Sequence, residues 1–399
     1  MVGGARMIHS LLPAIGLLAA APSPLAGIEL SGLQRTRPQT VLREFPASAT
    51  TDSLAFELGL QRLRNTALFS KVQGTWTPDA QVVALSEKWT TIPILKLRSG
   101  GGVTAYTLGL YDPNLLGRYL EAGAQYENHE GTHSGVVWLR EPRLLGTRTL
   151  LGADAWITHR LREDFAGESS RGWHGERRVR LHVFAEPEVR AGIVPHAGLE
   201  WLDDTLSSDL LELPREIAAT RRFGLSSRSL VANLGLRLGR IDTDLEMQEG
   251  WTIEPRADIA LAGSSFHRES IEARGFLRPA ARLNFATRLF WGTGSRRAEF
   301  HDWRIGGLEQ VRGLPDNFLL DDQAWFANFE SRATVWRGDF VRLQAVVFAD
   351  AGGIPGMDRR TSFGAGVRLL SPKLYRLVVR MDWAHGFEGG FSGGLQQFF

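Results

Sequence analysis

The chain has 399 residues, which is enough for two or three ordinary domains or for one large β-structure with a small module. Its 46 basic and 44 acidic residues nearly cancel, which removes the electrostatic argument for a nucleic-acid partner. The sequence has no cysteine, so disulfides, thiolate metal sites and cysteine nucleophiles are excluded. No apolar run reaches the roughly 18 residues that a membrane-spanning helix needs.

The first 26 residues have the pattern of an export signal. Arg6 and His9 precede the apolar stretch Leu11 to Ala21, and small residues follow as far as Ala26. The alternative is an N-terminal helix. The pattern predicts a signal peptide over residues 1–26 and export out of the cytoplasm.

Residues 27–91 have a mixed pattern of short strands and helices. A short strand is expected from Ile28, followed by a helix with Thr36 as its N-cap and Pro38 in its first turn. A second helix is expected to begin at a cap on Thr51 or Asp52. The stretches "VQGTW" and "QVVALSEKW" then alternate as two strands.

This order of elements predicts one small α+β domain. Together with "LQRLRNTALFSKV", Leu60 to Val72, it resembles a single polypeptide-transport-associated (POTRA) domain.

Residues 92–399 alternate between polar and apolar side chains in segments of about ten residues, which is typical of an outer-membrane barrel. Near the end of the chain, Val379, Met381 and Trp383 share one face of a strand, while Arg380 and Asp382 share the other. A soluble sandwich would fit this strand equally well. The whole pattern predicts a mainly β fold, a sixteen-stranded antiparallel transmembrane β-barrel. Its strands are expected to begin near Ile92, Val103, Tyr119, Ser134, Leu150, Gly172, Val189, Ser226, Trp251, Arg268, Leu283, Gln323, Val341, Thr361, Leu374 and Gly390.

The connections between these strands differ in length according to their place in the chain. The even-numbered ones are tight turns such as "EPRLLGTR" and "WRGD", and the long ones, including the stretch that contains "RIGGLEQVRGLPDNFLL", are odd-numbered. Short periplasmic turns and long outer loops are expected of a barrel, whereas a sandwich gives no reason for this parity.

Arg312 lies in the long stretch Arg304 to Leu320, between Val311 and Gly313. The strand alternation directs Glu330 and Asp350 into the lumen on neighbouring strands. An arginine folded into the lumen pairs well with carboxylates, because its planar guanidinium binds them with two parallel hydrogen bonds, and Gly313 lets the backbone turn closely. The alternative is a solvated arginine on a surface loop.

Three stretches in this region carry a resemblance to a known family. "IGGLEQVRGL" (Ile305 to Leu314), "NFESR" (Asn328 to Arg332) and "VVFADAGG" (Val346 to Gly353) resemble barrel motifs of the BamA/TamA superfamily of outer-membrane assembly and translocation proteins, also called the bacterial surface antigen family. The resemblance implies that the sixth outer loop folds into the lumen and that acidic side chains hold its arginine. The implied loop motif is Gly306, Gly307, Val311 and Gly313, and the implied holding set is Arg312, Glu330 and Asp350.

The same resemblance implies the location and the partners. It places the barrel in the bacterial outer membrane, with the lipid bilayer around it and the POTRA domain in the periplasm. Unfolded outer-membrane or secreted proteins are the implied clients, and periplasmic accessory subunits are further partners. Neither a cofactor nor a metal is implied.

Glycines are frequent where the barrel is expected to close. Gly390, Gly393 and Gly394 lie in the last strand, which ends near Phe399, and glycine weakens strand pairing. A weak seam between the first and last strands would open sideways and present free strand edges to a client. The alternative is that these glycines only serve the bend at closure.

The sequence offers little support for an enzyme. "GFSGG", Gly390 to Gly394, has the spacing of a nucleophile elbow with Ser392 as the nucleophile, but that motif requires a following helix and a later histidine. The hypotheses that remain are an assembly or translocation machine and a passive pore or structural barrel.

Overall fold

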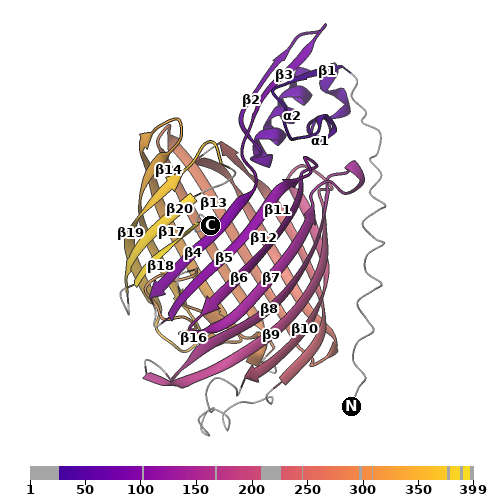
Figure 1. Ribbon diagram of the computed structural model, residues 1–399. Helices are drawn as coiled ribbons and strands as arrows, with labels where there is room; N and C mark the ends of the chain where they lie inside the picture. The colour runs from indigo at the N-terminus through magenta and orange to yellow at the C-terminus, as the bar shows by residue number, and fades with distance from the viewer. Residues whose placement is uncertain are drawn as a thin grey trace.

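The computed structural model describes residues 27–100, 103–166, 169–207, 226–244, 246–295, 299–307, 309–374, 378–386 and 390–395. The expected export segment, residues 1–26, and Phe399 lie outside these ranges. A small N-terminal domain stands at one end of a large barrel (Figure 1). We call that end of the barrel the proximal end and the opposite end the distal end.

The N-terminal domain packs two helices on a three-stranded sheet of order β1-β3-β2, in which β1 and β3 are parallel. Its core contains Val41, Phe45, Phe56, Leu60 and Leu63, all buried. Because β3 is central, β2 is an edge strand of this sheet. The elements are β1 (Ile28–Ser31), α1 (Pro38–Leu42), the 3-10 helix η2 (Ala47–Thr50), α2 (Ser53–Thr66), β2 (Phe69–Trp76) and β3 (Gln81–Glu87).

The helix caps partly follow the sequence pattern. Asp52 is the N-cap of α2, and its carboxylate accepts a hydrogen bond from the Leu54 N–H at 2.9 Å. The expectation for α1 was wrong, because Arg37 rather than Thr36 is its N-cap and makes no side-chain capping bond. The Thr36 hydroxyl instead accepts a hydrogen bond from the Asn114 amide of the barrel at 2.9 Å.

Buried polar contacts hold the N-terminal domain against the proximal turns of the barrel. The Arg143 guanidinium donates to both Glu44 carboxylate oxygens, at 2.7 Å and 2.6 Å, and Glu44 is fully buried. The Thr40 hydroxyl donates to the Gly117 carbonyl at 2.9 Å. A carboxylate and a guanidinium this enclosed stabilise the docked position because separating them would leave a charge without its partner.

In the described residues, sixteen strands form one closed antiparallel sheet. Successive strands of this sheet pair with each other, including β14 with β17, and β21 pairs with β4. The strands are tilted relative to the barrel axis (Figure 1). A short two-stranded ladder, β15 (Trp303–Ile305) with β16 (Leu319–Asp321), stands outside this sheet. The barrel strands are β4 (Ile92–Gly100), β5 (Val103–Leu115), β6 (Leu120–His129), β7 (Thr132–Glu141), β8 (Thr149–Ala166), β9 (Ser169–Pro187), β10 (Ile193–Ser207), β11 (Ser226–Asp244), β12 (Met247–Gly263), β13 (His267–Ala280), β14 (Leu283–Gly294), β17 (Ala324–Arg337), β18 (Arg342–Gly353), β19 (Arg360–Leu370), β20 (Val378–His385) and β21 (Gly390–Leu395), and two further 3-10 turns are η3 (Leu144–Gly146) and η4 (Glu299–His301).

The alternation of side chains along the strands follows the sequence pattern. In β17, Trp325 and Phe329 are exposed on the outside, whereas Asn328, Glu330 and Arg332 are buried on the inside. The expectation of a mainly β, antiparallel fold is confirmed. Among the described residues, no helix has the length and apolar character to cross a membrane.

Candidate functional site

The long connection between β14 and β17 turns back into the barrel between the two strands of its β15–β16 ladder. Gly306, Gly307 and Gly313 all have positive φ, at +135°, +73° and +84°. A Cβ at Gly306 would stand 2.2 Å from the Pro315 carbonyl oxygen, so a side chain there is incompatible with this backbone path. The glycines therefore allow the segment Gly306 to Phe318, which we call the inserted loop, to fold tightly.

Apolar side chains hold one side of the inserted loop. Val311, Leu314 and Phe318 are buried together with Ile305 and Phe326 in one hydrophobic cluster. Phe318 also meets the Phe165 ring edge-on, with ring centroids 5.1 Å apart. This packing removes apolar surface of the loop from water.

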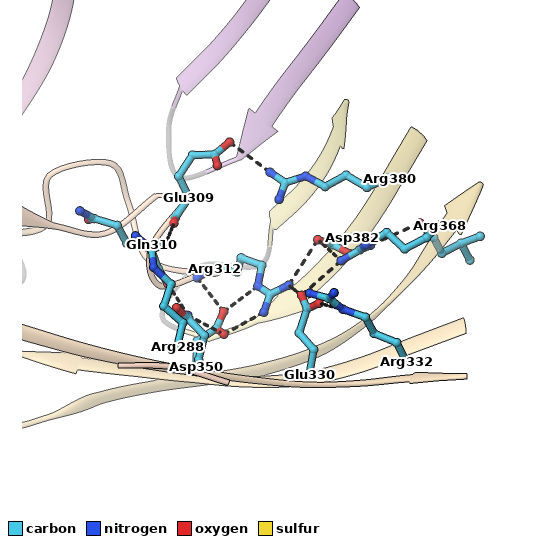
Figure 2. Close-up of polar contacts among 12 residues, drawn as sticks. Arg288, Glu309, Gln310, Arg312, Glu330, Arg332, Asp350, Arg368, Arg380 and Asp382 are labelled. Atoms are coloured by element: carbon cyan, nitrogen blue, oxygen red, sulfur yellow. Dashed lines mark hydrogen bonds and ion pairs between the residues drawn. The ribbon is translucent and has the colours of Figure 1, made fainter. Parts of the chain in front are cut away.

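Arg312 is fully buried and binds three carboxylates (Figure 2). Its Nε and Nη2 donate to the two oxygens of Asp350, at 2.7 Å and 2.8 Å, and its backbone N–H donates to the same carboxylate at 3.1 Å. Its Nη1 donates to Glu330 at 2.7 Å and lies 3.4 Å from Asp382. The structure thus brings Arg312, Glu330 and Asp350 together.

Three further residues, Arg332, Arg368 and Asp382, complete the cluster, and the sequence did not predict any of them at this site. Arg332 donates to Glu330 at 2.7 Å, and Arg368 bridges Glu330 and Asp382, at 3.3 Å and 3.2 Å. The sequence did contain a signal for Arg332 and Asp382, because the alternation along their strands directs both side chains toward the lumen. We call these six residues the Arg312 cluster: Arg312, Glu330, Arg332, Asp350, Arg368 and Asp382.

The Arg312 cluster is electrically balanced, with three guanidinium groups and three carboxylates, and all six residues are buried. The Arg312 guanidinium also lies over the Phe348 ring, with its carbon 3.4 Å from the ring centroid. Removing one member of such a set leaves a buried charge without its partner, which typically costs about 3–5 kcal/mol.

The loop backbone is held by further polar contacts. Asn328 donates to the Gln310 carbonyl oxygen at 2.6 Å, and the Gln310 side chain accepts from the Gly306 N–H at 3.1 Å. Arg380 on β20 donates to Glu309 at 3.1 Å. These contacts fix the part of the loop that precedes Arg312, at Glu309 and Gln310 (Figure 2).

The opposite wall of the barrel holds the outer part of the same connection. Arg304 on β15 donates to Glu176 on β9 at 2.6 Å, and Arg178 donates to the Phe300 carbonyl at 2.9 Å. The connection therefore spans the lumen between β9 and the β17–β20 wall.

The last strand, β21, pairs with the first barrel strand, β4. In the described residues, this pairing runs from Phe391 opposite Ser99 to Gly394 opposite Lys96. Gly390 and Gly393 face Ala384 and Met381 of β20. The expected terminal member of this seam, Phe399, lies outside the described residues.

The structure does not place Ser392 in the setting that a nucleophile elbow requires. Ser392 lies within β21, between Arg98 of β4 and Asp382 of β20 in register, rather than at a sharp strand-to-helix turn. Within the ranges that the structure describes, no group of three or more His, Cys, Asp or Glu side chains is arranged to hold a metal ion.

No family model and no curated protein sequence matches this chain. Solved barrels share its fold at low identity. BamA from Haemophilus ducreyi lacking POTRA domains 1–3 is 14% identical with a TM-score of 0.53, covering 92% of this chain and 82% of that one. CdiB from Escherichia coli is 13% identical with a TM-score of 0.60, covering 92% and 75%, and CdiB from Acinetobacter baumannii is 13% identical with a TM-score of 0.59, covering 93% and 73%. The chain therefore shares the fold of the BamA and CdiB barrels.

Proposed function

We propose that this protein assists the insertion, assembly or translocation of proteins at the bacterial outer membrane. Its clients in this proposal are unfolded outer-membrane or secreted proteins, and periplasmic accessory subunits are further partners. The exterior supports a lipid-embedded position, since Leu95, Leu97, Val347 and Trp383 are large apolar side chains exposed on the outside of the barrel.

The N-terminal domain in this proposal is a periplasmic POTRA domain, with boundaries near residues 27 and 91, preceded by an export signal over residues 1–26. Its β2 strand lies at the edge of the sheet and carries unpaired backbone groups along one side. An extended client segment adds to such an edge by main-chain hydrogen bonds.

One observation carries the proposal: the strand that closes the barrel is rich in glycine. Three of the six described residues of β21 are glycine, and two of them, Gly393 and Gly394, pair with β4. Glycine contributes no cross-strand side-chain contact, so this seam is a weak place in the cylinder. An opened seam presents two free strand edges that template an incoming client strand.

A disulfide across the seam tests the proposal, and the absence of native cysteine makes the experiment clean. The register pairs Phe391 with Ser99, so the double variant Ser99→Cys/Phe391→Cys joins β21 to β4 when oxidised. We expect the oxidised protein in liposomes to lose insertion of an unfolded client barrel and to regain it on reduction.

The matched control is a disulfide at a pair of strands away from the seam. Ala333 and Ala345 face each other on β17 and β18, and Ala333→Cys/Ala345→Cys is expected to insert clients equally well in both redox states. Full insertion by the oxidised seam variant would rule out the lateral opening.

The second candidate, a passive pore, predicts solute flux through liposomes and no effect of the seam disulfide. The inserted loop argues against it, because Arg312 and its partners occupy the lumen. Solute flux by the unmodified protein, with no client insertion, would favour the pore.

A further inference from the structure

We infer that the proximal turn between β11 and β12 couples the docked N-terminal domain to the inserted loop. The structure describes Glu246 of this turn and the first residues of β12, Met247 and Gln248. Glu246 and Met247 are buried, although they lie at the proximal end of the barrel, opposite to the end from which the inserted loop enters.

The first step of the coupling joins the N-terminal domain to β11. Asn65, in the last turn of α2, donates to the Asp242 carboxylate at 3.0 Å and accepts from the Thr243 N–H at 3.5 Å. Gln61 donates to the Asn65 side-chain oxygen at 3.1 Å, which orients the amide. A movement of α2 therefore acts directly on the strand that carries the turn.

The second step fixes the turn inside the barrel. The Glu246 carboxylate accepts from Arg337 Nε at 2.9 Å and from Arg342. The Gln344 amide donates to the Glu246 carbonyl at 3.4 Å. All three partners belong to β17 or β18, so a buried carboxylate joins the turn to the wall that also holds Arg312.

The third step reaches the Arg312 cluster itself. Gln248 Oε1 accepts a hydrogen bond from Arg332 Nη1 at 3.1 Å, and Arg332 donates to Glu330, which binds Arg312. Asn284 fixes the Gln248 backbone, because its amide donates to the Gln248 carbonyl at 2.7 Å and accepts from the Gln248 N–H at 3.2 Å. Gln248 is thus a positioning residue for Arg332 and, through Glu330, for the inserted loop.

This chain of contacts has a physical consequence. If α2 leaves its docked position, Asn65 releases Asp242 and Thr243, the turn loses its outer support, and the Gln248–Arg332 bond weakens. Because binding energies between linked sites are reciprocal, withdrawal of the inserted loop also loosens the N-terminal domain. The inference concerns the position of the loop and does not depend on whether the barrel inserts clients.

A thiol at Val311 reports the position of the loop, because Val311 is fully buried and the chain has no other cysteine. In the Val311→Cys chain, labelling by a soluble maleimide proceeds only when the loop leaves the lumen, so the rate measures the open population. Gln248→Ala is expected to raise the rate about tenfold, the factor for losing one hydrogen bond to a charged group. Gln248→Glu keeps the acceptor oxygen and is expected to preserve slow labelling.

A variant in the N-terminal domain, Asn65→Ala, tests whether that domain is coupled to the inserted loop. Asn65→Ala is expected to raise the labelling rate severalfold, and the double variant Asn65→Ala/Gln248→Ala is expected to label no faster than Gln248→Ala alone, since both act through one route. Thr40→Val is the control, because it removes a hydrogen bond between the N-terminal domain and Gly117, at a different proximal turn. Its labelling rate is expected to stay unchanged.

Any one of three results would overturn the inference. The first is a labelling rate of Asn65→Ala equal to that of the parent. The second is a double variant whose increase in labelling rate is the product of the two single increases, and the third is an increase for Thr40→Val as large as that for Asn65→Ala. Heat-modifiable migration on gels verifies that each variant has folded into a barrel before its rate is compared.

Discussion

Arg312 and Asp350 pair through three hydrogen bonds: two from the guanidinium to the two carboxylate oxygens and one from the Arg312 backbone N–H. The backbone bond matters because it fixes the position of the loop chain as well as the direction of the side chain. Asp350 is therefore the partner that best defines where the inserted loop lies.

Asp350→Asn is expected to destabilise the barrel by about 3 kcal/mol, because the buried Arg312 loses its bidentate anion while the side-chain shape is preserved. Urea unfolding in detergent micelles measures the change through tryptophan fluorescence. The control is Asp339→Asn, at an exposed position of the β17–β18 turn, with an expected change within about 0.5 kcal/mol. Equal stability of the two variants would mean that the cluster does not hold the loop.

Asp382→Asn is expected to cost about 3 kcal/mol, because the buried Arg312 and Arg368 both lose a negatively charged partner. The matched control is Glu309→Gln, which removes the half-exposed partner of Arg380 and is expected to cost less than about 1 kcal/mol. The same unfolding assay compares them. A cost for Asp382→Asn no larger than for Glu309→Gln would place Asp382 outside the set that stabilises the loop.

Gly306→Ala is expected to expel the inserted loop, because the new Cβ meets the Pro315 carbonyl oxygen in addition to the strain of a positive φ. Trypsin cleavage after Arg312 measures expulsion, since the buried arginine is protected in the parent. Gly356→Ala is the control: its φ is +77°, but nothing lies within 4 Å of the new Cβ. Protection of Arg312 in Gly306→Ala equal to that in the control would contradict the steric argument.

Much of the site was accessible from the sequence because strand alternation is a local property of the backbone. Once β17 and β18 are recognised as strands, the period of two sends Glu330 and Asp350 to the same side. The cap on Asp52 likewise followed from a local rule, whereas Thr36 failed as a cap because its hydroxyl bonds to Asn114, which lies 78 residues away in the chain.

Asp382 was not predicted as a member of the Arg312 cluster, and the reason lies in strand β19. Asp382 stands on β20, and β19 separates it from Asp350 in the sheet. The inward positions of β19 nearest to it are Gly364 and Gly366, and a Cβ at Gly366 would stand 2.0 Å from the Asp382 carboxylate. Because these glycines leave the space open, Arg312 reaches over β19 to a third carboxylate.

By itself, the sequence determined the strand pattern, the inward carboxylates and the glycines that let a loop containing Arg312 turn tightly. The tertiary structure decided which inward charges share one cluster and that a second turn, carrying Gln248, meets it from the proximal end. The physical reason is that parity assigns a side chain to a face, whereas register, strand tilt and the space left by small residues on intervening strands determine which groups on that face touch.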